Sequence, residues 1–310
     1  MAVLSPSREA AGPPPEPAGS HEKQGPPGGH RPSAWLVVPG AALTLLAALL
    51  LGFVVNVALL GHIEHARAQQ TAFAELRTEL ARGTAPVGRL DDKGRPVPMG
   101  APVAVLHIKA IGLKEVVLQG TTSGVLRSGP GHRRDTPLPG QPGTSIIMGR
   151  QWGYGSPFHH IDELRAGDAV TVTTGQGQQQ YKVTGVRRAG DPAPGAPAGG
   201  RGRLTLITAT GGPYTPHGLL RVDAELVSDV QPGPPAGGGL TDAEQALAGD
   251  PAAWLPVLLW TQGLLLVAVA VTWTYRRWGR RQTWICAVPV LTAVVVALSG
   301  EATRLLPNLL

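Results

Sequence analysis

The chain contains 310 residues, of which 42 are glycine and 30 are proline, so much of it is expected to form loops and linkers. Its formal net charge is +6, but the basic residues do not form one face interleaved with aromatic side chains. A nucleic-acid partner is therefore not expected. The single cysteine, Cys286, lies in an apolar run and excludes an intrachain disulfide and a cysteine-based metal site. We expect neither a metal ion nor a cofactor.

The N-terminal part of the chain divides into a polar and an apolar segment. Residues 1–34 are rich in proline, glycine and charge and lack apolar periodicity, which predicts a disordered cytoplasmic segment. Residues 35–61 contain no ionisable side chain, and a helix crosses a bilayer with about 20 apolar residues. This run is too long for a cleaved signal peptide, so we expect a retained transmembrane helix.

A stalk and linker are expected over residues 62–100, beginning with a helix over 62–84. Apolar residues recur there at helical spacing, at Ile63, Ala66, Phe73, Leu76 and Leu80. His62 and His65 are three residues apart on this helix and could suggest a metal pair. No third ligand follows nearby, so we expect both to be solvated.

The pattern changes to short strands in the region 101–230. Runs rich in valine, isoleucine, leucine and threonine, punctuated by glycine and proline, occupy 103–108, 115–120, 144–149, 168–174, 181–186, 204–209 and 219–227. No long helical pattern separates them. The region is therefore predicted to be mainly β, as a barrel or a sandwich.

Two further apolar segments follow the strand-rich region. Residues 231–252 contain glycine- and proline-rich sequence and are predicted to form a flexible linker. Residues 253–275 and 283–300 are predicted to be a second and a third transmembrane helix.

The segment 276–282 between these two helices indicates the orientation of the chain. Its basic residues are Arg276, Arg277, Arg280 and Arg281. Because arginine is enriched in cytoplasmic loops, this segment is expected inside the cell. The N-terminus would then be cytoplasmic, while the strand-rich domain and the tail 301–310 would lie outside. The sequence thus predicts a multi-pass protein of the cell membrane.

Four segments of the strand-rich region carry further motifs. They read IGLKEVVLQG at 111–120, LRSGPGHRRDTPLPGQPGTSIIMGR at 126–150, GYGSPFHHIDELRAGDAVTV at 153–172 and LTLITAT at 204–210. Their order and spacing resemble the sortase family, which contains cysteine transpeptidases on the outer face of Gram-positive membranes. The resemblance covers roughly residues 101–228 and implies a sortase-like β-barrel held by one N-terminal and two C-terminal transmembrane helices.

The chemistry of that family needs three side chains. A cysteine attacks the substrate carbonyl, a histidine transfers protons, and an arginine donates hydrogen bonds to the substrate and the developing oxyanion. The resemblance places Arg150 at the histidine position and Ala209 at the cysteine position. Counting back five residues from Ala224 places Leu219 at the arginine position.

Arg221 is an alternative to Leu219 as the counterpart of the family arginine. The two residues are separated by one position, so they share a face of the same strand. Arg150, Thr208 and Arg221 are accordingly the candidates for binding an extended peptide or a carboxylate in the cleft.

These replacements predict a pseudoenzyme. Alanine offers no nucleophile, and an arginine with a pKa of about 12.5 or higher does not act as a base. The resemblance then implies a membrane-anchored protein with a binding or accessory role in cell-envelope protein sorting. Its expected partners are the lipid bilayer and either a sorting-signal peptide or an active sortase.

Two alternatives stay open on the sequence. The first is an active transpeptidase or hydrolase with relocated groups, in which a hydroxyl acts with His159 or His160. The hydroxyls considered are those of Ser145, Ser156, Thr208 and Thr210. The second is a folded spacer between the membrane anchors.

Overall fold

The computed structural model describes residues 47, 49–55, 59–212, 215–234, 239–278 and 280–310. The predicted disordered segment 1–34 and much of the predicted first transmembrane helix therefore lie outside the described residues. Within that helix, residues 49–55 are helical. All features below belong to one compact unit, residues 46–310.

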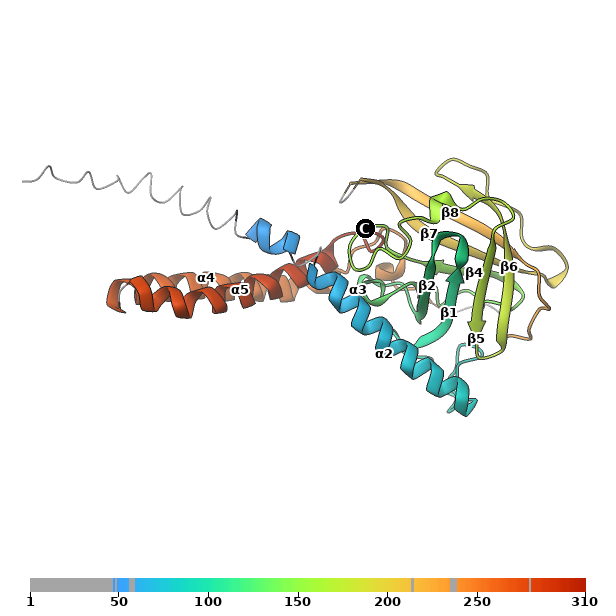
Figure 1. Cartoon of the computed structure of the whole chain (residues 1–310), viewed down its shortest axis with the longest axis horizontal. Helices are drawn as coiled ribbons and strands as arrows, with labels where there is room; N and C mark the ends of the chain where they lie inside the picture. Colours follow the sequence, from blue (N-terminus) through green and yellow to red (C-terminus); the bar gives the residue numbers. More distant parts are fainter. Residues whose placement is uncertain (1–46, 48, 56–58, 213–214, 235–238, 279) are drawn as a thin grey trace, which may run out of the picture. The chain divides into compact units, whose positions relative to one another are not determined.

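Eight strands close into a barrel in the order β1-β2-β3-β4-β7-β8-β6-β5 (Figure 1). The strands are β1 (Pro102–Ile108), β2 (Leu113–Gln119), β3 (Gly131–His132), β4 (Gly143–Met148), β5 (Ala169–Thr174), β6 (Gly177–Arg187), β7 (Gly202–Gly212) and β8 (Thr215–Leu226). All seven predicted runs are strands, and the mainly β fold is confirmed. The two-residue β3 is the one that the sequence pattern missed, because it is too short to show alternation.

The barrel interior is filled by the aliphatic residues of these strands. Leu106, Val172, Leu204 and Val222 are examples from four strands that are buried in one core cluster, together with Phe158 from the loop after β4. Side chains alternate between the two faces of a strand, so each run of valine, isoleucine and leucine supplies the core with every second residue. Burial of a side chain of this size contributes about 1.5–3 kcal/mol.

Helix α2 (Gly61–Arg82) is the helix expected over 62–84. It contacts β1, β2 and the short helix α3 (Ser123–Ser128). Ala72 and Leu76 are buried there, whereas Ile63 and Phe73 are exposed. Leu76 and the partly buried Leu80 belong to the apolar spacing that predicts this helix, so part of that set packs on the barrel.

Polar side chains of α2 fix its position on the barrel through hydrogen bonds. The Gln69 side chain accepts from Val116 N at 2.6 Å and donates to the carbonyl oxygens of Val116 and Ser128. His65 is buried, and its Nε2 lies 3.2 Å from Glu115 Oε1. The expectation that His65 is solvated is therefore wrong, because the ring is enclosed between the helix and β2.

The predicted linker 231–252 is folded over part of its length. Residues Asp242–Glu244 form the short helix η5. Thr241 precedes this helix, and the side chains of Thr241 and Glu244 each bond the backbone N–H of the other residue. The Glu244 side chain is buried and forms an ion pair with Arg134. This segment is fixed on the barrel by a long-range charge pair, which its glycine-rich composition does not reveal.

Helices α4 (Trp254–Trp278) and α5 (Arg280–Leu305) follow, and they pack against each other. Two helical segments, Pro251–Tyr275 and Arg281–Leu305, are long and apolar enough to cross a membrane. The predicted basic loop 276–282 is mostly helical, because arginine is compatible with a helix. Helix α5 also extends five residues beyond the predicted end of the third span, into the expected tail 301–310.

Candidate functional site

The parallel pairing of β4 and β7 brings the predicted site residues together. Met148 at the end of β4 pairs with Ile207 of β7, and Gly149 N–H donates to Ile207 O at 3.0 Å. Arg150 follows directly, beside the end of β7 that holds Thr208. A side chain at position 149 would collide with Phe158, because a Cβ there would lie 2.6 Å from its ring. Glycine is therefore required where the chain leaves β4.

The antiparallel pairing of β7 and β8 places the other two residues opposite each other. Ala209 pairs with Leu219, and Ile207 pairs with Arg221. Leu219, Arg221 and Ile207 line one groove with a volume of about 250 Å³ on this part of the barrel. Leu219 and Arg221 thus share a face, as their spacing predicts, and both border the same groove.

Arg150 is an almost fully buried cation. Only 2% of its surface is exposed. Its Nη2 donates to Ser123 Oγ at 2.9 Å, and its Nη1 donates to the backbone oxygen of Leu310 at 2.5 Å. The guanidinium also lies over the ring of Tyr154, 5.1 Å from the centroid. Such a group can bind a peptide oxygen by charge-assisted hydrogen bonds, but a guanidinium does not act as a general acid or base near neutral pH.

Ala209 lies deep in the site and is not exposed at all. Its methyl group belongs to an apolar cluster with Leu126, Met148, Leu309 and Leu310. Thr208 next to it is buried, and its hydroxyl donates to Gly149 O at 2.8 Å. Thr208 therefore holds the β4–β7 junction and does not present its hydroxyl to the groove, which differs from its predicted role in binding.

The histidines considered for a relocated mechanism make other contacts. His159 Nδ1 lies 3.1 Å from Gln151 O, and His160 Nδ1 lies 2.7 Å from Glu163 Oε1. The Ser156 hydroxyl donates to Gly153 O at 3.4 Å. Within the described residues, neither histidine forms a hydrogen bond to a serine or threonine hydroxyl, so the geometry gives this alternative no support.

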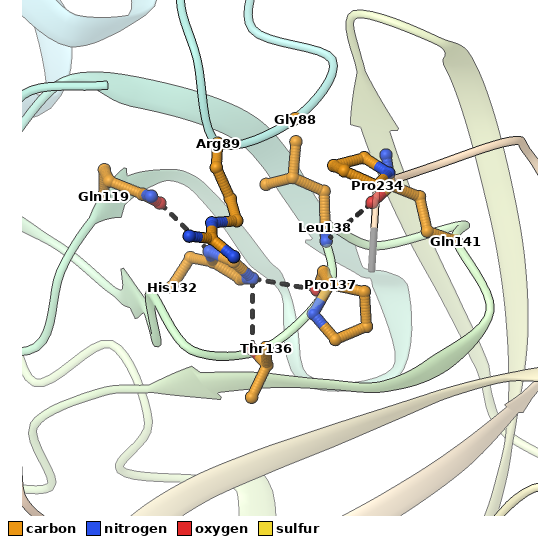
Figure 2. A pocket seen from close by; sticks show the side chains of 9 residues that line it. All are labelled: Gly88, Arg89, Gln119, His132, Thr136, Pro137, Leu138, Gln141 and Pro234. Atoms are coloured by element: carbon orange, nitrogen blue, oxygen red, sulfur yellow. Dashed lines mark hydrogen bonds between the residues drawn. The ribbon is translucent and has the colours of Figure 1, made fainter. Parts of the chain in front are cut away.

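His132 lies near a hydroxyl in a small pocket that is also lined by Gln119, Thr136 and Pro137 (Figure 2). Its ring nitrogens lie 3.0 Å from Gln119 Oε1 and 3.0 Å from Pro137 O, and Thr136 Oγ1 is 3.3 Å from Nε2. Burial lowers the pKa of His132 to about 4, against hydrogen bonding to Pro137 and the charge of Asp135, which raise it. The ring is therefore neutral near pH 7. Its hydrogen bonds to Pro137 and Thr136 stabilise the β3–β4 connection.

Two participants in the site were not predicted from the sequence. Ser123 holds Arg150 from α3, and Leu309 and Leu310 lie against Arg150 and Ala209. Both are far from β4 and β7 in the chain, and no local pattern marks them.

Comparison with known proteins identifies the class of this barrel. The family model of the sortase domain matches residues 106–225, a range that includes Arg150, Ala209 and Leu219. The structure of sortase E from Streptomyces avermitilis is 30% identical, and the match covers 43% of this chain and 91% of that chain with a TM-score of 0.36. A sortase transpeptidase from Clostridium perfringens is 21% identical, covering 52% and 99% with a TM-score of 0.44. No curated protein matches the sequence.

The family model and the identity to sortase E define the family. This chain belongs to the sortase family through its barrel domain.

Proposed function

We propose that this protein is a membrane-anchored, non-catalytic member of the sortase family, with a binding or accessory role in protein sorting at the cell envelope. The supporting observation is that Ala209 and Leu219 face each other across β7 and β8, with Arg150 following the end of β4. The resemblance assigns these three positions to the cysteine, the arginine and the histidine of the family. Their adjacency supports that assignment.

The chemistry of the three side chains argues against turnover. A methyl group forms no acyl-enzyme, and a guanidinium does not remove a proton from a nucleophile near neutral pH. In well-studied hydrolases, loss of one member of a nucleophile–base pair costs about 10⁴–10⁶ in rate. The buried guanidinium retains one useful property, which is the ability to bind a peptide oxygen.

The arrangement of the apolar helices supports a membrane location with the barrel outside. Residues 308–310 follow α5 and contact the barrel, so this end of α5 and the barrel lie on the same side of the membrane. The basic residues between α4 and α5 favour the cytoplasmic side for the opposite end of the helix pair.

Restoration of the family residues tests the proposal. The unaltered chain, purified in detergent, should not cleave a panel of sorting-type peptides. The triple variant Arg150→His, Ala209→Cys and Leu219→Arg should form a covalent acyl-enzyme that mass spectrometry detects. The single variant Ala209→Cys is the matched control and should form much less. Turnover by the unaltered chain, removed by replacing a serine or threonine, would instead establish the relocated mechanism.

A further inference from the structure

The segment Pro307–Leu310 enters the site with Leu309 and Leu310, which lie against Arg150 and Ala209. Asn308 and Leu309 have no exposed surface, and Leu310 is 4% exposed. Pro307 is only partly buried. The burial of the three residues that follow it indicates a specific binding site for them.

The walls of that site are apolar where the two leucines lie. Leu309 and Leu310 form one buried cluster with Leu126 of α3, Met148 of β4 and Ala209 of β7. Ala209 has the smallest of the buried side chains in this cluster. The residue that the family resemblance links to lost catalysis thus also packs in the cluster that holds this segment.

The backbone of the segment is bound directly, so this part of the binding does not require particular side chains in the segment. Gln151 N–H donates to Leu309 O at 2.9 Å, and Arg150 Nη1 donates to Leu310 O at 2.5 Å. Leu310 N–H donates to Pro307 O at 3.1 Å, so the segment is held as a turn. Main-chain hydrogen bonds of this kind give affinity without requiring particular side chains. The same donors would serve another peptide of similar shape.

Asn308 adds specificity from the opposite side. Its side-chain nitrogen donates to Thr121 O at 2.8 Å and to Gln245 O at 2.9 Å. Its backbone N–H donates to Ala248 O at 2.9 Å. The folded part of the linker thus forms the outer wall of the site, and the Arg134–Glu244 pair fixes that wall on the barrel.

We propose that this site is a peptide-binding groove and that the chain's own residues 307–310 occupy it as an intramolecular ligand. The groove accepts a peptide in which an asparagine precedes two aliphatic residues. Withdrawal of the segment opens the groove to such a peptide supplied in trans. This inference rests on the proposed binding function, and it adds the ligand class and the means by which access is controlled.

Tethering explains why the segment would keep a free peptide out. A ligand on a short linker has an effective concentration of about 1 mM. If the free peptide binds the open groove with a dissociation constant of about 10–100 µM, the tethered segment reduces its apparent affinity about 10- to 100-fold. Release of the segment should therefore be measurable as a gain in peptide binding.

The experiment uses the full chain in lipid nanodiscs and a fluorescent peptide of the sequence RLLPNLL. Leu309→Asp should release the segment, because a carboxylate is not accommodated in the apolar cluster. We expect the peptide to bind this variant about 10- to 100-fold more tightly than the unaltered chain. The same replacement at the exposed Leu90 is the matched control and should leave binding unchanged.

A second measurement does not depend on the added peptide. In a Cys286→Ser background, Ala209→Cys places a thiol beneath Leu309 and Leu310. The thiol should be alkylated at least about 10-fold faster when Leu309→Asp or the milder Asn308→Ala is present. Adding Arg150→Ala to the released variant should weaken peptide binding about 10-fold, because it removes a charge-assisted hydrogen bond.

The possible failures are distinguishable. If the thiol at position 209 is equally reactive with and without the segment in place, or if the released groove does not bind the peptide, the inference is overturned. Cleavage of the peptide by the unaltered chain would contradict the non-catalytic function proposed above, and mass spectrometry of the peptide detects it separately from binding.

Discussion

His132 is a single residue whose environment makes stability depend on pH. Its pKa is lowered to about 4 by burial, whereas an unfolded histidine has a pKa near 6.5. Between these two values the unfolded chain binds a proton that the folded chain does not bind. The free energy of unfolding should therefore be largest above pH 6.5 and fall by about 3 kcal/mol as the pH decreases toward 4.

Urea unfolding of the purified chain between pH 7.5 and 4.5 measures this dependence. His132→Gln should remove most of the loss below pH 6.5, whatever it does to stability at neutral pH. His160→Gln, at an exposed histidine, is the matched control. An unchanged pH slope in the His132 variant would contradict the assignment of the effect to this ring.

Arg134 is a second residue that affects stability, although its position in the sequence does not suggest this. Its partner Glu244 is fully buried. Burial alone would raise the pKa of that carboxyl, but the hydrogen bonds from Arg134 and Thr241 and the charge of Arg134 together hold it below its usual value. Arg134→Ala leaves the buried carboxylate without its counterion. We expect a loss of about 3 kcal/mol in the free energy of unfolding.

The neighbouring Arg133 provides the control for this prediction. It pairs with Asp135, and both side chains of that pair are partly exposed. Arg133→Ala should therefore cost less than about 1 kcal/mol in the same denaturation experiment. Equal losses in the two variants would show that the buried carboxylate is not what makes Arg134 important.

At the scale of elements, the attachment of α2 depends on the side chain of Gln69. This side chain forms three hydrogen bonds to backbone groups of the barrel. Gln69→Ala leaves those groups without partners, so we expect a loss of about 1–3 kcal/mol and faster hydrogen exchange at the Val116 amide. Gln70→Ala, one position along on the exposed face, should change neither quantity.

The whole molecule allows a prediction about topology. If α4 and α5 span the membrane with their connection inside, a membrane-impermeant maleimide should label Asp229→Cys in intact cells and should not label Arg281→Cys. Both variants are made in the Cys286→Ser background, and permeabilised cells supply the control in which both thiols react. Labelling of the second thiol in intact cells would reverse the proposed orientation.

The strand-rich domain and the apolar helices α4 and α5 were predictable from the sequence, and its motifs predict Arg150 and Ala209 as site positions. Each of these depends on local patterns: alternating valine and isoleucine runs for the strands, apolar length for α4 and α5, and flanking motifs for Arg150 and Ala209. Local patterns determine such features because backbone geometry repeats over a few residues.

Which surfaces meet follows from the tertiary structure and not from local sequence patterns. The tertiary structure placed His65 and Gln69 against β2, fixed Glu244 on Arg134, and put residues 307–310 into the groove beside Ala209. These contacts join segments between 47 and 160 positions apart in the chain. Their stability depends on the burial and pairing of groups that a local pattern does not relate to each other.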